Sequence, residues 1–587
     1  MKILGISGHY HDSAAALVIG GVPVAAVQEE RLSRRKNDAG FPLAAIEWCL
    51  DHAGLSPGDL DAVIFYEKPT LKFDRILTGL LQGYPRSWHS YPKAMKNMLG
   101  EKLWVRGLIA SQLGISARKV KCIEHHQSHA AAAFLAAPTQ EAAIITADGV
   151  GEWATLTVGT GVKRADGSSE IRMLRELRFP HSLGLFYSAV TAYLGFTVNE
   201  GEYKVMGLAS YGQPTRIDSM RLLLRPAPGG AFTLDLDYFD FLGKVESGFS
   251  ERFVDLFGPP RKSWQPIDLK SEEGRRFADI AASAQALLEE VMVGIAADLQ
   301  RETGMADLCL GGGVALNGVA NARILREAGF GRLFVPSAPG DAGCALGAAL
   351  YADRILFGQQ HKPVPDHPFW GPGPDEAALL RIAREDDIPA TANGAVIEEV
   401  ADALAADRIV GWIDGALEYG PRALGHRSIL AAPHDAAMRD RLNRDIKYRE
   451  EFRPFAPVVA AEHADMFFEL PPGGARLARF MSGVVPVRPE WQSRLAAVTH
   501  VDGTARVQVL DREMEPRLHA LLEAYGKRSG IPVLLNTSFN LAGEPIVNSA
   551  AEAYSTFRRC GIDLLVAGSV CVTKPRIVRA QILENVA

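Results

Sequence analysis

The sequence predicts an α/β protein, with two similar N-terminal halves followed by a further α/β unit. Two strand-rich segments, "MKILGISGHYHDSAAALVIGGVPVAAVQEER" and "EAAIITADGVGEWATLTVGTG", are each followed by helical segments. A stretch rich in proline and glycine, near residues 357 to 375, marks a domain boundary. A chain of 587 residues is long enough for several such structural units.

The first half is expected to begin with three strands. "MKILGIS" and the two apolar runs around Gly20 and Gly21 give a strand and then a hairpin. "PLAAIEWCLDHAGL" is an amphipathic helix that ends at Gly54, and "LDAVIFY" is the next strand. Residues 68 to 120 form a mostly helical insertion, whose aromatic residues either stack on a ligand or belong to the core.

The stretch "EHHQSHAAAAFLAA" runs from a strand into an alanine-rich helix. His125 and His129 lie one turn apart on one face, and His126 is turned away. The pair either caps the helix or binds a metal. An H-E-x-x-H zinc-protease motif is excluded, because His126 occupies the position of the glutamate.

The second half contains two aspartates that either have a structural role or bind a metal. Asp148 follows an apolar strand in "TADGVGE", and Asp341 precedes a small-residue helix in "SAPGDAGCALGAAL". Turn formation and helix capping are the ordinary roles of such residues. Together with the two histidines they form a mixed nitrogen and oxygen set, which suits iron, manganese or zinc better than calcium. The turn "GGGVALNGVAN" either binds an anion or is a plain tight turn.

Composition narrows the function classes. A net charge of −6 argues against a nucleic-acid partner. No apolar run reaches about 20 residues, so no membrane span is expected, and the N-terminus leads straight into a strand rather than a signal peptide. The six cysteines are scattered without a C-x-x-C pair, which favours the reducing cytoplasm.

The C-terminal unit carries basic residues among glycine, proline and aromatic residues. Bidentate guanidinium groups suit a phosphate pocket, and short amide and hydroxyl donors at a strand end add to it. An anion pocket is therefore predicted from Arg422, His426, Arg427, Lys447, Arg449, Arg453, Arg506, Asn536, Ser538 and Asn540.

Nine motifs in order resemble the O-carbamoyltransferases, which include nodulation-factor, cephem-antibiotic, novobiocin and tobramycin carbamoyltransferases. The resemblance runs from Met1 to about Lys574. It implies an actin-like ATPase-type lobe over residues 1–360, similar to the threonylcarbamoyl-transfer metalloprotein, and a YrdC-like lobe over 375–587. The motifs are "GISGHYHDSAAAL", "QEERLSRRKN", "HHQSHAAAAF", "GEYKVMGLASYG", "GGVALNGVAN", "GDAGCALGAAL", "EYGPRALGHRSIL", "REEFRPFAPVV" and "LNTSFN".

The resemblance also implies the chemistry. Carbamoyl phosphate and ATP, with Mg²⁺, give carbamoyl-adenylate in the C-terminal lobe. The N-terminal lobe, with Fe²⁺ or another divalent metal, transfers the carbamoyl group to a hydroxyl of a small-molecule acceptor. The main alternative is a threonylcarbamoyl-type tRNA-modifying enzyme, which the acidic net charge disfavours. A hydrogenase-maturation carrier lacks support because zinc-finger cysteines are missing, and a non-catalytic binding protein is the remaining rival. The oligomeric state is open, a homodimer included.

Residue roles are carried over from the same resemblance. His11 corresponds to a catalytic base and Lys36 to a basic residue near the reacting centre, and Asp237 or Asp240 to an acidic site residue. The metal ligands correspond to His125, His129, Asp148 and Asp341. The nucleotide-binding turn corresponds to Gly311, Gly312 and Asn317. The C-terminal pocket corresponds to Arg422, Lys447, Arg453, Met481, Arg506 and Ser538.

Overall fold

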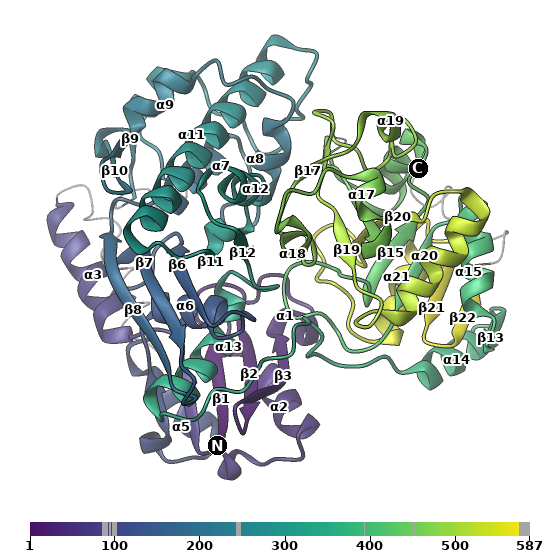
Figure 1. The fold of residues 1–587 in the computed structure, drawn as a ribbon, viewed down its shortest axis with the longest axis horizontal. Coiled ribbons are helices and arrows are strands. Elements are labelled where there is room, and N and C mark those ends of the chain that lie inside the picture. Colours follow the sequence, from purple (N-terminus) through teal and green to yellow (C-terminus); the bar gives the residue numbers. More distant parts are fainter. Residues whose placement is uncertain are drawn as a thin grey trace. The chain divides into compact units, whose positions relative to one another are not determined.

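The computed structural model describes residues 1–84, 92, 95–96, 102–241, 248–392, 394–450 and 452–574. The chain forms two compact units. The first contains Met1–Ala26 and Ala39–Asp366, and the second contains Val27–Asp38 and His367–Ala587. A short N-terminal segment thus belongs to the second unit, and each unit is described by itself below (Figure 1).

The first unit contains two five-stranded sheets with the same topology. The first has the order β3-β2-β1-β4-β5 and the second the order β12-β11-β6-β7-β8. In both, three antiparallel strands are followed by two parallel ones. The first sheet comprises β1 Lys2–Ser7, β2 Ala14–Ile19, β3 Val22–Gln28, β4 Ala62–Phe65 and β5 Val120–Cys122. The second comprises β6 Glu141–Ala147, β7 Ala154–Lys163, β8 Ser169–Arg178, β11 Asp307–Gly311 and β12 Arg332–Phe334.

This repetition confirms the predicted α/β class and its two similar N-terminal halves. The central strands are apolar on both faces, because helices cover the sheets. The turn between β2 and β3 lies at Gly20 and Gly21, and both have the positive φ that such a hairpin requires.

Two helices, α6 (His125–Phe134) and α13 (Asp341–Tyr351), pack against each other and against the sheets. Their close approach depends on residues without side chains. A Cβ at Gly347 would overlap the carbonyl oxygen of Ser128 on α6, and one at Gly5 on β1 would overlap that of Ala345. The small residues along α13 therefore fix the position of its first residue, Asp341, relative to α6.

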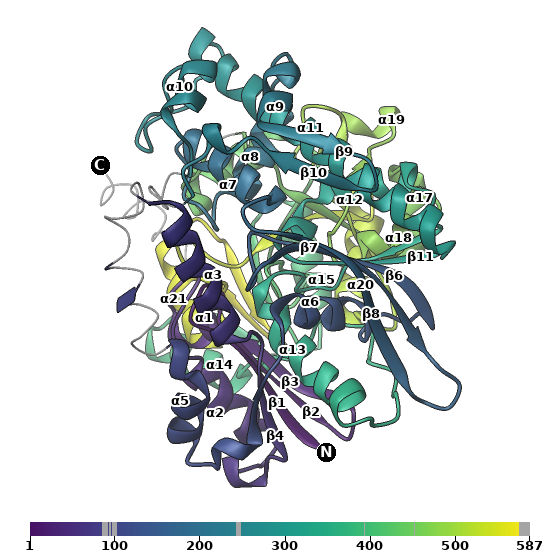
Figure 2. The same ribbon diagram turned by 90° about the vertical axis from the view of Figure 1, so that its left-hand side faces the viewer.

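Four helices of the first unit, α7, α8, α9 and α12, contact the long helix α11 (Glu272–Thr303), and Figure 2 shows them grouped near it. Ser271 caps its first turn, and Gly304 ends it in the left-handed conformation. Besides α6, α11 and α13, the helices of the first unit are α2 Leu43–His52, α3 Pro69–Gln82, α5 Val105–Leu113, α7 Leu183–Tyr193, α8 Glu202–Ala209, α9 Ile217–Leu223, α10 Glu251–Phe257 and α12 Gly318–Glu327. The hairpin β9 Leu224–Ala227 and β10 Ala231–Leu234 completes the unit.

Among the described residues, α11 is the one helix whose length and composition would suit a membrane span. Buried residues make up 67% of its most apolar window, as in the core helix of a globular domain.

The described part of the predicted helical insertion is helical, with α3, α5 and short 3-10 turns. Of its aromatic residues, Trp104 is exposed, and Tyr66, just before the insertion, is fully buried in the core. Trp88 and Tyr91 lie outside the described residues.

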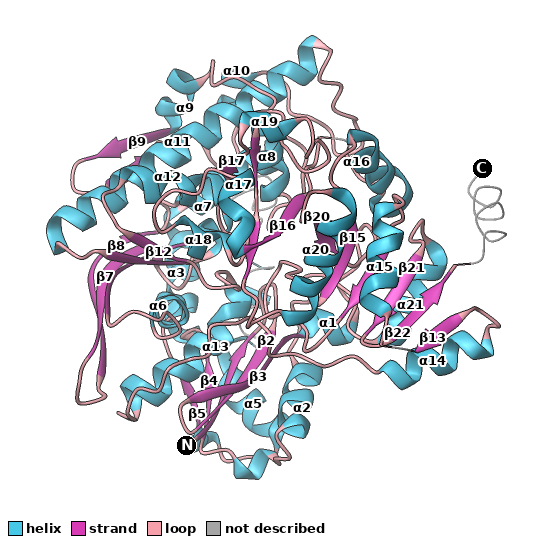
Figure 3. Cartoon of the chain, turned by 45° about the vertical axis from the view of Figure 1, so that its right-hand side comes forward, coloured by secondary structure: helices cyan, strands magenta, loops and turns pink. Residues whose placement is uncertain are grey.

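The second unit is built on an eight-stranded mixed sheet of order β13-β22-β21-β14-β15-β20-β16-β19, with helices on both faces (Figure 3). Val410 and Trp412 on β14 face the helices α15 and α20, whereas Ile413 faces the opposite layer. The strands are β13 Ala390–Ala392, β14 Val410–Ile413, β15 Arg427–Ala431, β16 Ala456–Ala460, β19 Gln508–Leu510, β20 Val533–Ser538, β21 Leu564–Ala567 and β22 Val570–Thr573, with a separate pair β17 Val485–Pro486 and β18 Thr504–Ala505.

Helices α14, α16 and α21 cover the second face of this sheet. The helices of the unit are α1 Glu29–Ser33, α14 Glu376–Glu385, α15 Val396–Ala405, α16 Ala436–Leu442, α17 Ala464–Phe467, α18 Gly474–Ala478, α19 Pro489–Gln492, α20 Pro516–Ser529 and α21 Ala550–Arg559. The unit is therefore a three-layer α/β/α arrangement.

The contact between α6 and α13 gives a stability prediction. Gly347→Val should lower the free energy of unfolding of the first unit by about 1–3 kcal/mol, because the new side chain forces the helices apart. Gly294→Ala is the control, because Gly294 on α11 has open space around it and should gain about 0.5–1 kcal/mol. Urea unfolding measures both, and an unchanged Gly347→Val transition would contradict the close-packing argument.

Candidate functional site

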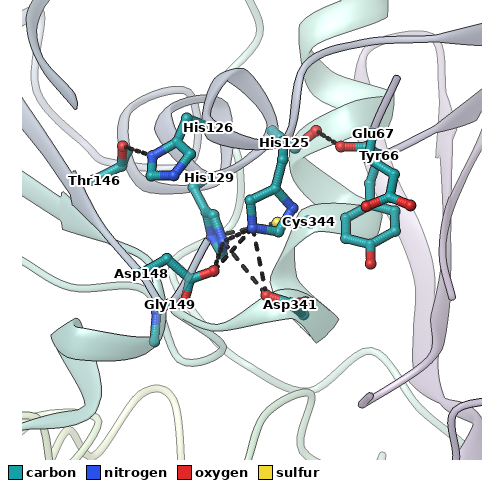
Figure 4. Close-up of polar contacts among 12 residues, drawn as sticks. Tyr66, Glu67, His125, His126, His129, Thr146, Asp148, Gly149, Asp341 and Cys344 are labelled. Carbon is teal, nitrogen blue, oxygen red and sulfur yellow. Dashed lines mark hydrogen bonds and ion pairs between the residues drawn. The ribbon is translucent and has the colours of Figure 1, made fainter. Parts of the chain in front are cut away.

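The first candidate site begins at the N-terminus of α6. His125 and His129 are both buried, and their Nε2 atoms lie 3.0 Å apart. His126 points away, and its Nδ1 bonds Thr146 Oγ1 at 2.6 Å (Figure 4). The helical spacing predicted from the sequence therefore does bring the two imidazoles to one point.

Two carboxylates meet these imidazoles. Asp148, directly after β6, places Oδ2 at 2.9 Å from His125 Nε2 and 3.6 Å from His129 Nε2. Asp341, the first residue of α13, places Oδ1 at 3.7 Å and 3.5 Å from the same two nitrogens. The four residues come from three separate parts of the chain, and the structure brings all of them together (Figure 4).

The donor set fits a divalent transition metal. Metal–nitrogen bonds of about 2.0–2.1 Å place neighbouring ligand atoms about 3 Å apart, close to the separation of the two Nε2 atoms. Burial would raise the pKa of the Asp148 carboxyl, but hydrogen bonds to His125 and His129 hold it well below its usual range. Asp341 Oδ2 is buried without a hydrogen-bond partner among the described residues. Two buried anionic oxygens beside two imidazoles are what a cation requires.

Cys344 also contacts the site, and sequence reasoning missed it. Its Sγ lies 3.3 Å from His129 Nδ1, on the side of the ring away from Nε2. The thiol therefore contacts the ring nitrogen opposite the one that faces Asp148 and Asp341, and burial raises its pKa to about 12. Cys344 therefore fits a role in orienting His129 better than a role as a fifth ligand. The sequence could have indicated Cys344, because it lies one helical turn after Asp341 on α13 and therefore on the same face.

Glu152 is a second residue that the sequence did not single out. Its carboxylate accepts hydrogen bonds from the backbone N–H of His125, at 3.1 and 3.2 Å, and from that of Lys68, at 2.7 Å. It thereby satisfies the first turn of α6 and fixes the segment that leads into α3.

His11 lies on the loop between β1 and β2, close to the carboxylates. Its Nε2 is 3.9 Å from Asp341 Oδ2, and its Nδ1 is 3.0 Å from Asp12 Oδ2. Burial lowers the pKa of the His11 imidazole, but Asp341 and Asp12 outweigh this effect and raise it to about 9. His9 and Asp12 on either side have positive φ, a strained backbone typical of functional loops.

The glycine turn after β11 supports Asp148. Gly312 has a φ of +93°, and a Cβ there would overlap the carbonyl oxygen of Ala147. The next N–H, from Gly313, donates to Asp148 Oδ1 at 3.0 Å. Gly311 lies against the carbonyl of His129 on α6. The turn thus has a structural role at the site, and nucleotide binding by Gly311 and Gly312 stays a prediction.

Asn317 is engaged within the protein. Its Oδ1 caps α12 by accepting from the N–H of Ala320 at 3.0 Å, and its amide exchanges hydrogen bonds with Gln285. If Asn317 binds a nucleotide, its side chain has to do so while it keeps these hydrogen bonds. Asp237 is exposed and pairs with Arg252 at the surface, and the assignment of an acidic site residue to Asp237 or Asp240 stays a prediction.

The second candidate site lies in the second unit, where predicted basic residues gather. Burial and the positive charges of Arg422, Arg449 and Arg453 hold the pKa of the Arg506 guanidinium well below its usual range. Arg506 Nε is buried without a hydrogen-bond partner among the described residues. We call this set, Arg422, Arg449, Arg453 and Arg506, the arginine cluster; such a concentration of positive charge is stabilised by a bound anion.

Lys447 lies beside the cluster and holds the loop that follows β20. Its Nζ donates to Asn540 Oδ1 at 2.8 Å, to the Asn540 carbonyl at 3.1 Å and to Ser538 Oγ at 3.2 Å. Burial and the neighbouring arginines hold the pKa of Lys447 well below its usual range. The ammonium therefore orients Ser538, and the side chain of Ser538 also donates to Asn540.

Lys36 is grouped with this basic set, because Val27–Asp38 belongs to the second unit. It lies within electrostatic reach of Lys447, whose pKa it helps to lower. The segment is held by Arg31, which donates to the carbonyl of Gly420 at 2.9 Å, and by Arg34, which donates to that of Ile546 at 2.7 Å. Met481, also predicted here, is buried and has a positive φ of 55°.

These features define an α/β protein with a buried group of two imidazoles and two carboxylates in its first unit and an arginine cluster in its second, and the comparisons with known proteins give its family. The family described as Carbamoyltransferase N-terminus matches residues 2–350, and that described as Carbamoyltransferase C-terminus matches residues 401–574. The chain therefore belongs to the carbamoyltransferase family and is a carbamoyltransferase enzyme.

Relatives cover nearly the whole chain. Nodulation protein NolNO of Sinorhizobium fredii is 37% identical over 96% of this chain and 79% of its own length. An uncharacterized protein of Synechocystis is 41% identical over 97% of this chain and 96% of its own length. The solved structure of T. kodakarensis HypF has 14% identity and a TM-score of 0.31, over 61% of this chain and 48% of that one, which is too low to support an argument.

The mixed-ligand centre gives a prediction on metal content. Asp148→Asn and His129→Ala should each retain far less divalent metal than wild type after reconstitution, since each removes a converging donor. Cys344→Ser should keep its metal, with an affinity loss within the roughly 10–100-fold range of supporting residues. Elemental analysis measures all three, and equal loss in Cys344→Ser and Asp148→Asn would make the thiol a ligand.

Proposed function

We propose that this chain is an ATP-dependent O-carbamoyltransferase for a hydroxyl of a small-molecule natural product or sugar. The proposal rests on the arginine cluster of the second unit, together with the family assignment. The first unit would carry out the transfer, and the second, as a YrdC-like domain, would activate the carbamoyl group. A cytoplasmic location, with no nucleic-acid or membrane partner, accompanies this proposal.

In the proposed activation, the carbamoyl-phosphate bond is cleaved by water to give carbamate and phosphate. A carbamate oxygen then attacks the α-phosphorus of ATP, carried as its Mg²⁺ complex, and pyrophosphate leaves. Both reactants and both leaving groups are anions, so Arg422, Arg453 and Arg506 would neutralise charge that develops during the reaction. Ser538, oriented by Lys447, adds a hydroxyl donor.

In the proposed transfer, an acceptor hydroxyl attacks the carbamoyl carbon and AMP leaves. His11 would take the hydroxyl proton, a contribution worth roughly 10²–10⁴-fold. It has to be free of its own proton first, and any neutralisation of Asp341 favours that release. His125, His129, Asp148 and Asp341 would hold a divalent metal, iron first among the candidates, which supplies Lewis-acid polarisation of the carbamoyl or phosphoryl oxygen.

The threonylcarbamoyl-type tRNA-modifying reaction remains the alternative. It would share the mixed-ligand centre and the activation chemistry, but it needs a surface that attracts a polyanion. The net charge of −6 supports the small-molecule acceptor instead.

The test is ATP–pyrophosphate exchange and AMP release, with and without carbamoyl phosphate. Wild type should show turnover that depends on carbamoyl phosphate, and Arg506→Ala should lose about 10²–10³-fold of it, as when a donor to developing charge is removed. Arg444→Ala is a matched control, because Arg444 lies on an exposed surface and pairs only with Asp445 among the described residues. AMP release without any dependence on carbamoyl phosphate would refute the proposed chemistry.

A further inference from the structure

We propose that Arg75, on the inward face of α3, binds an anionic group of the acceptor, so that the natural acceptor is an alcohol carrying a carboxylate or phosphate. This inference rests on the proposed function for the identity of the ligand. The anion-binding role of Arg75 itself rests on the geometry around α3.

The burial pattern of α3 is inverted for a surface helix. Its inward face carries two cations, Lys72 and Arg75, three residues apart, whereas Leu81 is 65% exposed. Lys72 is accounted for, because its Nζ pairs with Glu67 Oε2 at 2.6 Å. Arg75 has no such carboxylate partner among the described residues, although it is only 8% exposed.

Arg75 is a buried cation that forms no ion pair with the residues that the structure describes. No carboxylate of the described residues lies within 4.0 Å of its guanidinium, and the centre of the Phe179 ring lies 5.4 Å from its Cζ. Two acidic groups that act electrostatically on Arg75 are already engaged: Glu67 with Lys72, and Glu152 with the backbone N–H groups of His125 and Lys68. A buried charge left in this state is costly, and a bound anion would remove the cost.

The position of Arg75 connects it to the proposed transfer site. Burial lowers the pKa of its guanidinium, and Tyr10, Glu67 and Glu152 partly restore it, so Tyr10 lies within electrostatic reach. The Tyr10 ring is 4.4 Å from that of His11, and Lys72 Nζ lies 5.2 Å from the Tyr10 centroid. Tyr10 is 40% exposed, so this end of the group of residues faces solvent.

An acceptor that offers its hydroxyl to His11 would therefore extend across Tyr10 and place its far end at Arg75. The planar guanidinium matches carboxylate and phosphate with two parallel hydrogen bonds. The ring of Phe179 would support one face of the guanidinium while its N–H edge binds the anion.

The first test is calorimetric titration of inorganic phosphate into the full chain. Every protein tested carries Arg506→Ala, so that phosphate binding at the arginine cluster is weakened, and the chain with this substitution alone is the parent. Arg75→Gln should bind phosphate about tenfold more weakly or worse, and Arg75→Lys, which keeps the charge but not the fork, should fall between. Arg301→Gln, at an exposed arginine on α11, should match the parent. Equal phosphate affinity in the parent, Arg75→Gln and Arg75→Lys overturns the proposal, and the lysine variant decides if the glutamine variant does not fold.

The second test separates the two sources of such an anion. Glycerol 3-phosphate and glycerate represent acceptor alcohols with an anionic group, glycerol is the neutral control, and AMP represents the adenylate. Competition with phosphate by the two anionic alcohols, lost in Arg75→Gln, supports an anionic acceptor. If AMP alone depends on Arg75, the assignment to the acceptor is overturned. Carbamoyl-phosphate-dependent AMP release by wild type tests the proposed function separately, since its failure would leave the phosphate titration unaffected.

Discussion

The first unit depends on the convergence of two imidazoles and two carboxylates at one buried point. Neither pair is stable there alone, because buried charge requires a compensating partner. The surrounding structure serves this convergence: Gly347 and Gly5 allow α13 to approach, Gly313 holds Asp148, and Glu152 satisfies the first turn of α6. Placing these four polar side chains in the core therefore costs folding stability that an apolar core would have kept, as is common at functional sites.

The second unit presents the opposite problem, since its site is made of like charges. Arg506 and Lys447 are both pushed toward their neutral forms by burial and by neighbouring cations. The fold tolerates this arrangement because Lys447 is saturated with oxygens of Ser538 and Asn540. An anionic substrate would relieve the remaining repulsion, so substrate binding and stability of this unit are coupled.

Sequence patterns predicted much of this fold because periodicity and turn residues report local structure. The hairpin at Gly20 and Gly21, the α6 histidine pair and the duplicated halves all follow from such local signals. Contacts between residues far apart in the sequence leave no local pattern. In the sequence, Cys344 looks like any other small apolar residue of α13, and Glu152 looks like an ordinary turn residue. The same reason explains why nothing in "QEERLSRRKN" indicates that Val27–Asp38 belongs with residues far downstream.

The repeated topology of the first unit divides the candidate metal ligands between its two halves. His125 and Asp341 occupy equivalent places, each opening the helix that follows the last strand of its half. His11 and Asp148 are likewise equivalent, each in the hairpin loop after the first strand. The first half therefore supplies the imidazoles His125 and His129, and the second half supplies the carboxylates Asp148 and Asp341. Neither half alone contains the complete set, so the two halves can form this site only within one chain that holds them together.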